Sequence, residues 1–562
     1  MVFLFFSICL VVSLLFFVPY PLLRPLKQGL FLFSFLLTVL SFVINRSLFY
    51  PRLQAFWKAW ILREVKHSNL WIRVSVGIIL FGFLYHGYLL SQGFASSFQF
   101  HDADYVGMQE VVRNLMRGSG YLSSYYSANG EGSYLAHHFS PSLIFFVPFE
   151  SLGFGRWGYA IGVYFYLSLG TILWTEILLK KKATQIGNGN INLIYLLLIG
   201  ILTNLYLYRL GTSYHFEVLV YPLSAVLFYY MEKEKISIGL FVSLFAFLFV
   251  KEDIAIYTVL FLTPAVVWNG ISRFLEEKKE REGKWAIQNI RFEIGLVVLL
   301  VSLAYLLFVF FLLPNFFNVN SEHWFGVLTK DYPESYKQVT SLSKSVQIFF
   351  ELVISGGTGI IFNLPSFVGL LFIYLTHALS HRPWHHEVYS YYCYTIVPFL
   401  VFSGIVWMKE KKSLSITIFF LFLTLLFFRN LQDSNFPIAV EQIGLFEEEK
   451  RNAKEVTSEL DRIRSQNTLS GFPIIFSQYN LSFSLPKEAI LYPLNQVSLV
   501  PKTCATKECY LVIAPNFTKE ALVPRAFIES KRNLFLQGVL VFKGKWIEIW
   551  KYKPNASNHD TI

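Results

Sequence analysis

The chain has 562 residues, of which 54% are hydrophobic and only 15% are charged. Soluble globular proteins carry about 25% charged residues, so this chain lacks the polar surface that would cover it in water. Its net charge of +11 comes from short basic clusters between apolar runs, which is typical of membrane topology and argues against nucleic acid as a partner. We therefore predict a membrane protein whose main partner is the lipid bilayer.

Apolar runs long enough to cross a bilayer recur as far as residue 428. The stretch 214–271 holds three of them, separated by the polar segments 232–235 and 251–253. The run 346–379 is too long for one span and contains Pro365, so we expect a hairpin of two short helices there. The remaining candidates are 2–20, 28–45, 70–91, 157–179, 191–209, 293–313, 391–408 and 413–428. This pattern predicts an all-α polytopic membrane bundle with about 13 transmembrane helices.

The basic clusters predict the topology. They lie within 46–69, 180–182, 233–235, 273–291 and 409–412. An even number of predicted spans separates each pair, so all of them can lie in the cytoplasm, as basic loops usually do. The N-terminus is then cytoplasmic, and the long loop 92–156 and the C-terminal domain lie outside the cytoplasmic (inner) membrane. The apolar end of that loop, 141–154, is predicted to be a short helix in the membrane interface.

Three domains follow from this organisation. Residues 1–69 comprise two additional N-terminal spans and a basic cytoplasmic loop, 70–428 form the main transmembrane domain, and 429–562 form a soluble extracytoplasmic domain. In the last, 444–466 has the pattern of an amphipathic helix, and apolar segments at 473–478, 489–494, 509–515 and 538–552 have that of strands, so we predict a small α/β fold. Cys504 and Cys509 share a polar loop in this oxidising location, and we predict a disulfide between them.

Two groups of polar residues in the loop 92–156 are candidates for chemistry. Asp102 and Asp104 could share a divalent metal ion or supply a general base, although either could instead cap the start of the helix that contains Met108 to Met116. His137 and His138 precede a Ser-Pro turn and could hydrogen-bond a phosphate or bind metal. The alternative for the histidines is a place beside an interfacial helix.

Charged residues at the edges of two later spans are the other candidates. His215 and Glu217 enter a span from the outer side, and Lys251, Glu252 and Asp253 separate two short apolar runs. Charges at a membrane edge must be paired or solvated in a cavity, although a tight polar turn would also explain the triplet. We predict no metal at His377, His381 and His385, because Pro383 interrupts their helical spacing. The sequence contains no Walker A motif, which argues against an ATP-driven pump.

Several of these segments together resemble a known family. They are LAHHFSPSLIFFVPFESLG (135–153), TSYHFEVLVYPL (212–223), LFVKEDIAIY (248–257), LPNF (313–316) and YYCYTIVPFL (391–400). Their order over 70–540 is similar to that of the bacterial domain-of-unknown-function family 2079 (DUF2079). Where that family usually begins its outer loop with a Phe-Asp-Leu-Gly-like string, this chain has His101-Asp102-Ala103-Asp104-Tyr105, so the resemblance does not decide which aspartate corresponds.

The DUF2079 family in turn resembles the GT-C glycosyltransferases, which implies a GT-C-like fold and a catalytic acidic residue in the first outer loop. It also implies a polyprenyl-phosphate-linked sugar donor as substrate. In that case Asp104 or Asp102 would deprotonate the acceptor or hold a metal. Lys251, His137 and His138 would neutralise the leaving phosphate, with Glu252 and Asp253 orienting them. The alternatives are a transporter or flippase of lipid-linked or polar solutes, for which we would expect internal symmetry and central charges, and a non-catalytic envelope scaffold.

Overall fold

The computed structural model describes the chain in segments, within two compact units. One unit comprises 1–87, 139–142 and 160–440, and the other comprises 88–138, 143–159 and 441–562. The described residues of the first are positions within 73–84 and the segments 139–142, 160–185, 210, 215–233, 236–276, 291–313, 364–380, 391–399 and 401–402. Those of the second are 103–123, 133–136, 138, 143–152, 158–159, 447–465 and most positions of 474–494 and 504–552 that form the sheet and its cover.

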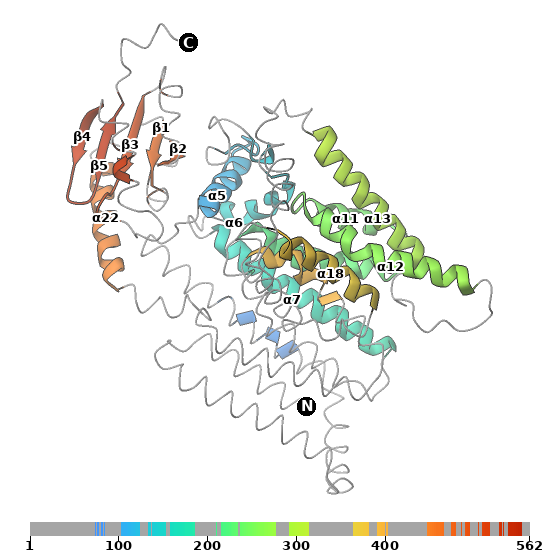
Figure 1. Ribbon diagram of the computed structural model, residues 1–562. Coiled ribbons are helices and arrows are strands. Elements are labelled where there is room, and N and C mark those ends of the chain that lie inside the picture. The colour runs from blue at the N-terminus through green and yellow to red at the C-terminus, as the bar shows by residue number, and fades with distance from the viewer. Residues whose placement is uncertain are drawn as a thin grey trace, which may run out of the picture. The chain divides into compact units, whose positions relative to one another are not determined.

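The first unit is helical (Figure 1). Among the described residues, three helical segments are long and apolar enough to cross a membrane, namely Gly158–Ile177, Ile254–Ser272 and Phe292–Leu312. They lie within α7 (Gly158–Gln185), α12 (Ile254–Glu276) and α13 (Phe292–Leu307) with its π-helical extension Phe308–Leu312. These helices confirm that the segments predicted as spans at 157–179, at 293–313 and at the end of 214–271 are helices of sufficient length and hydropathy. The predicted spans 2–20, 28–45, 191–209 and 413–428 lie outside the described residues.

The predicted breaks within 214–271 are also found. A 3-10 turn (Phe216–Leu219) leads into α10 (Val220–Met231), which is followed by α11 (Ile238–Leu248) and then α12. The charged segment 232–235 ends α10 because charged side chains are costly in an apolar helix, and Ser237 then caps α11 by accepting a hydrogen bond from the Leu240 N–H at 3.4 Å. Of the predicted hairpin, α18 (Leu364–Ala378) is described, with Pro365 in its first turn.

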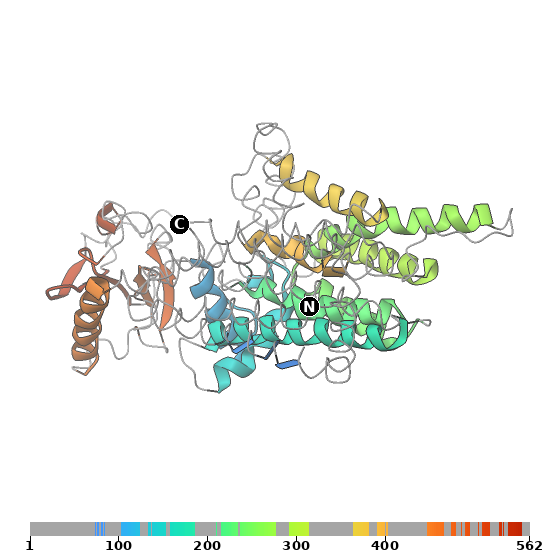
Figure 2. The ribbon, with the colours of Figure 1, turned by 90° about the horizontal axis from the view of Figure 1, so that it is seen from below.

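Close backbone contact holds α12 against α18, and α13 packs along α12 as well (Figure 2). Gly369 of α18 faces the Phe261 backbone of α12 so closely that a Cβ at residue 369 would overlap the Phe261 carbonyl oxygen. Small residues permit this kind of approach between membrane helices, where van der Waals packing replaces the hydrophobic effect. The glycine therefore sets the α12–α18 distance.

Replacing Gly369 by leucine should lower the stability of the helical unit by about 1–3 kcal/mol, because backbone cannot move aside as a flexible side chain can. Gly77→Leu is the matched control, since a Cβ there would meet no atom of the described residues within 4 Å. Thermal unfolding in detergent measures both variants. Equal midpoints for the two would show that the glycine does not set the helix spacing.

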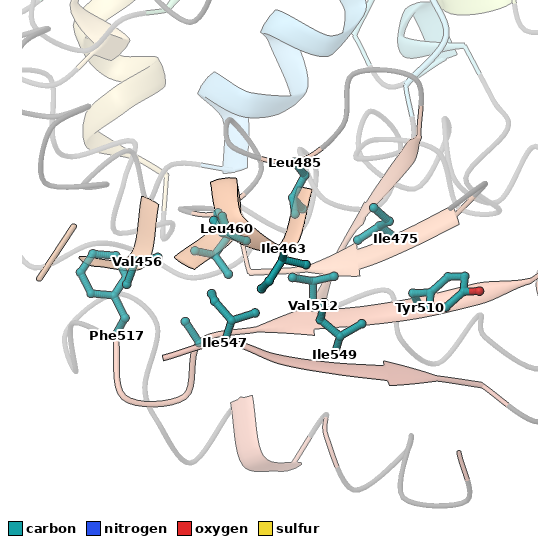
Figure 3. Packing of buried hydrophobic residues seen from close by; sticks show 12 residues of the cluster. Val456, Leu460, Ile463, Ile475, Leu485, Tyr510, Val512, Phe517, Ile547 and Ile549 are labelled. Atoms are coloured by element: carbon teal, nitrogen blue, oxygen red, sulfur yellow. The ribbon is translucent and has the colours of Figure 1, made fainter. Parts of the chain in front are cut away.

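The C-terminal part of the second unit is a small α/β structure. The strands described there form one sheet with the order β2-β1-β3-β5-β4, in which β1 (Ile474–Ser477) is parallel to both β2 (Ile490–Pro493) and β3 (Cys509–Ile513). The hairpin of β4 (Val539–Lys543) and β5 (Glu548–Lys551) adds antiparallel to β3. Helix α22 (Glu447–Ser465) covers one face, and its Val456, Leu460 and Ile463 pack toward the sheet (Figure 3). The predicted helix and strands are confirmed.

The predicted disulfide is confirmed too. Cys504 and Cys509 are bonded to each other. Both cysteines are buried on the sheet face opposite α22, among Ile474, Leu511 and Ile528. The bond fixes the loop before β3 to the first residue of that strand.

Candidate active site

The turn that joins α11 to α12 is the most highly charged buried segment in the described part of the chain. It carries Lys251, Glu252 and Asp253, whose exposed fractions are 5%, 1% and 2%. Three consecutive ionisable residues of this kind are tolerated at a membrane edge only if each is paired or solvated. The structure assigns each a different partner segment.

Lys251 pairs with Glu217. Its Nζ donates to Glu217 Oε1 at 3.0 Å, across 34 positions of sequence. Glu217 lies in the 3-10 turn before α10, and its other oxygen, Oε2, lies 3.5 Å from Nδ1 of His215. Because His215 and Glu217 are both almost completely buried, the Glu217 carboxylate lies between an ammonium and an imidazole largely away from water, where an unpaired charge is costly.

Glu252 holds the segment that follows the two histidines. Its Oε2 accepts a hydrogen bond from the backbone N–H of Phe139 at 2.9 Å. Three residues on, the Ser142 N–H donates to the Phe249 carbonyl at 3.2 Å, and the Phe139 ring packs against Phe249 and Tyr305. Residues 139–142 are thus fixed to the α11–α12 turn, and His138 is the residue directly before them.

Asp253 binds a third segment. Its Oδ2 accepts a hydrogen bond from the hydroxyl of Tyr394, and the Tyr394 ring lies 5.0 Å from the Lys251 ammonium. Tyr394 belongs to a 3-10 turn, Tyr391–Thr395, within the span predicted at 391–408. Sequence reasoning missed this residue because a tyrosine in an apolar run is expected in any span. The only available signal was its place in the motif YYCYTIVPFL.

The loop that holds the predicted catalytic aspartates is described in part. Helix α5 (Ala103–Met116) contains the predicted helical stretch from Met108 to Met116 and has Asp104 in its first turn. Arg113 of α5 donates to Glu150 of α6 (Val147–Ser151) at 2.6 Å, which fixes the two helices to each other. The Asp104 side chain, together with Asp102 and His137, lies outside the described residues.

Of the remaining histidine candidates, the structure describes His138 and His377. The His138 N–H donates to the Tyr134 carbonyl at 2.9 Å, and its ring lies edge-on to that of Tyr134. His377 bonds the Thr395 hydroxyl through Nε2 at 2.9 Å, while His381 and His385 are outside the described residues. Among described residues, no group of three His, Cys, Asp or Glu side chains is placed to hold a metal ion. A metal at Asp102 and Asp104 stays a prediction.

Glu252 offers a direct test of this arrangement. Glu252→Ala should cost about 1–3 kcal/mol of stability, because the buried Phe139 N–H loses its acceptor. Glu252→Gln keeps an oxygen that can accept the bond, so it should recover most of the loss. Thermal unfolding and limited proteolysis of the 134–142 segment measure the two variants. A glutamine variant as unstable as the alanine variant would show that the hydrogen bond does not hold this segment.

Comparison with known proteins adds the following. The structure of ArnT from Cupriavidus metallidurans bound to undecaprenyl phosphate is similar to this chain with a TM-score of 0.45 and 11% sequence identity, covering 83% of this chain and 99% of that one. A likeness this distant identifies no reaction. No curated protein matches the sequence. The family model described as a predicted membrane protein, DUF2079, matches residues 95–458, a range that includes all the motifs on which the resemblance was based. The chain therefore belongs to the DUF2079 family of predicted membrane proteins.

Proposed function

We propose that the protein is a GT-C-like glycosyltransferase that takes a sugar from a polyprenyl-phosphate-linked donor at the outer face of the cytoplasmic membrane. The observation that carries the proposal is the buried group of His215, Glu217 and Lys251 at the start of α10 and the α11–α12 turn. Burying these charges is costly. Such a cost is typical of a site that must recognise a charged group beside the bilayer.

The proposed reaction is a single displacement at the sugar. Asp104 or Asp102 takes the proton of an acceptor hydroxyl, directly or with a divalent metal held by the same carboxylates. The acceptor oxygen forms a bond to the anomeric carbon as the bond from that carbon to the phosphate oxygen breaks. The electron pair leaves on the polyprenyl phosphate. Lys251, His137 and His138 stabilise the negative charge that develops on this leaving group.

The acidic partners have a positioning role in this scheme. Glu217 holds Lys251 in the apolar surroundings, and Glu252 holds the backbone directly after His138. Preorganised charges cost no reorganisation when the reaction occurs, so fixing them in advance favours the transition state. Positioning of this kind accounts for three consecutive charges better than a polar turn does, because a turn needs none of these long-range contacts.

We further propose that the N-terminus is cytoplasmic and the C-terminal domain extracytoplasmic. The parity of the basic loops supports this topology, and the Cys504–Cys509 disulfide supports it independently, because disulfides persist in oxidising compartments. An alkaline phosphatase fused after residue 470 should be active. Inactivity there, with activity of a cytoplasmic reporter at the same position, would overturn the topology.

The function is tested with the full chain purified into nanodiscs. Polyprenyl phosphates that carry different radiolabelled sugars are supplied as donors, and release of free polyprenyl phosphate is measured with and without a chelator. We expect release with at least one donor, and its loss on chelation would identify the metal-assisted route. No release from any donor, combined with movement of labelled lipid across the bilayer of proteoliposomes, would contradict the enzyme and favour a flippase.

A further inference from the structure

Tyr394 contacts two members of the charged turn at once. Its hydroxyl donates to Asp253, and its ring faces the Lys251 ammonium at 5.0 Å. The side chain is fully buried. An aromatic ring attracts a cation through its negative face, more strongly where water is excluded. Lys251 therefore has an acidic partner in Glu217 and an aromatic partner in Tyr394, contributed by different parts of the chain.

The turn that carries Tyr394 is itself held on two sides. Its last residue, Thr395, bonds His377 of α18 at 2.9 Å, and the His377 ring lies parallel to that of Tyr257, a residue of α12. Tyr257 also meets Tyr394 edge-on, with ring centroids 6.5 Å apart. Tyr394 is thus tied to Asp253, the residue directly before α12, and to Tyr257 in the first turn of α12, so its ring has little freedom to turn away from the ammonium.

The two contacts have separate chemical roles. The hydrogen bond from the hydroxyl to Asp253 orients the ring, so that the face of the ring is directed at the Lys251 ammonium. A residue needed only to fill space would not require both, since leucine or phenylalanine would serve in an apolar core.

We propose that Tyr394 is a positioning residue that fixes the Lys251 ammonium for contact with the lipid-linked phosphate. The role in phosphate binding rests on the proposed function. The contact itself does not. Tyr394 acts through Lys251 and does not touch the reacting atoms.

The test uses undecaprenyl phosphate as the probe, titrated into the full chain in nanodiscs. Tyr394→Leu removes both contacts and should weaken binding about tenfold, the change expected from losing a desolvated cation–π contact. Tyr394→Phe keeps the ring, so its affinity for the probe should lie between that of Tyr394→Leu and that of the wild type. Tyr392→Phe, in the same turn, is the control and should bind as the wild type does. A folded Tyr394→Leu variant with wild-type affinity would overturn the proposal.

A second measurement separates positioning from general packing. In a chain that already carries Glu217→Leu and Lys251→Met, Tyr394→Leu should have no further effect on binding, because the group that it positions is gone. An undiminished tenfold loss in that background would overturn the role.

If the wild type binds no undecaprenyl phosphate, the proposed function fails. The contact between Tyr394 and Lys251 is then tested separately, by the free energies of unfolding of the variants. Non-additive effects of Lys251→Met and Tyr394→Leu would support it, whereas additive effects would overturn it.

Discussion

Lys251→Met is expected to destabilise the helical unit by about 3–5 kcal/mol, because it leaves Glu217 buried without the ammonium beside it. The pair is nearly inaccessible to water, with side-chain exposures of 6% for Lys251 and 1% for Glu217. Thermal unfolding in detergent measures the effect. Replacing both partners, with Glu217→Leu added to Lys251→Met, should recover most of the loss, because the buried carboxylate that lost its ammonium is then gone.

Arg73 and Glu176 provide the matched control. Their side chains are also in contact, at 2.8 Å, but they are 57% and 37% exposed. Exposed pairs contribute about 0–1 kcal/mol, so Arg73→Met should change stability little. If Lys251→Met were no more harmful than Arg73→Met, Lys251 would not be part of a desolvated ion pair, and the central contact of the site would be wrong.

Asp104→Asn should reduce turnover by about 10²–10⁴-fold, the usual contribution of a positioned general base, while leaving folding intact. Asparagine has nearly the same size and cannot take a proton from the acceptor. Asp104 lies in the first turn of α5, where loss of a negative charge costs only a few tenths to about 1 kcal/mol. Turnover per folded molecule, with binding of the donor measured separately, distinguishes chemistry from affinity.

Asp102→Asn is the comparison for this substitution. If Asp104 is the only base, Asp102→Asn should retain most activity, and if the two share a metal, both variants should lose activity together with metal binding. Full activity in both single variants and in the double variant would exclude the first outer loop as the source of the base.

Much of the fold was predictable because it follows from local patterns. The charged segments 232–235 and 251–253 divide 214–271 into three helices, because charged side chains are costly inside an apolar helix and therefore end it. Alternation and apolar runs located the strands of the C-terminal sheet. The shared loop of Cys504 and Cys509, together with its predicted oxidising location, was sufficient to predict their bond. The helix expected after Asp102 or Asp104, with Met108 to Met116 in it, is found as α5.

The pairing within the site could not be predicted in the same way. Lys251 bonds Glu217, which lies 34 positions away in the sequence. Asp253 bonds Tyr394, 141 positions away, and Glu252 bonds a backbone N–H 113 positions away. These partners are selected by how the helices pack, and no single-sequence pattern records that. Tyr394 in particular has the composition of an ordinary span residue.

The most direct test of the central claim is an experimental structure of the full chain in nanodiscs with undecaprenyl phosphate bound. We expect Asp104, His137, Glu217 and Lys251 to line one cavity at the outer membrane edge, with the phosphate beside Lys251 and the two histidines. A structure that placed Lys251 against lipid, or more than about three helix diameters of roughly 10 Å each from Asp104, would contradict a shared active site.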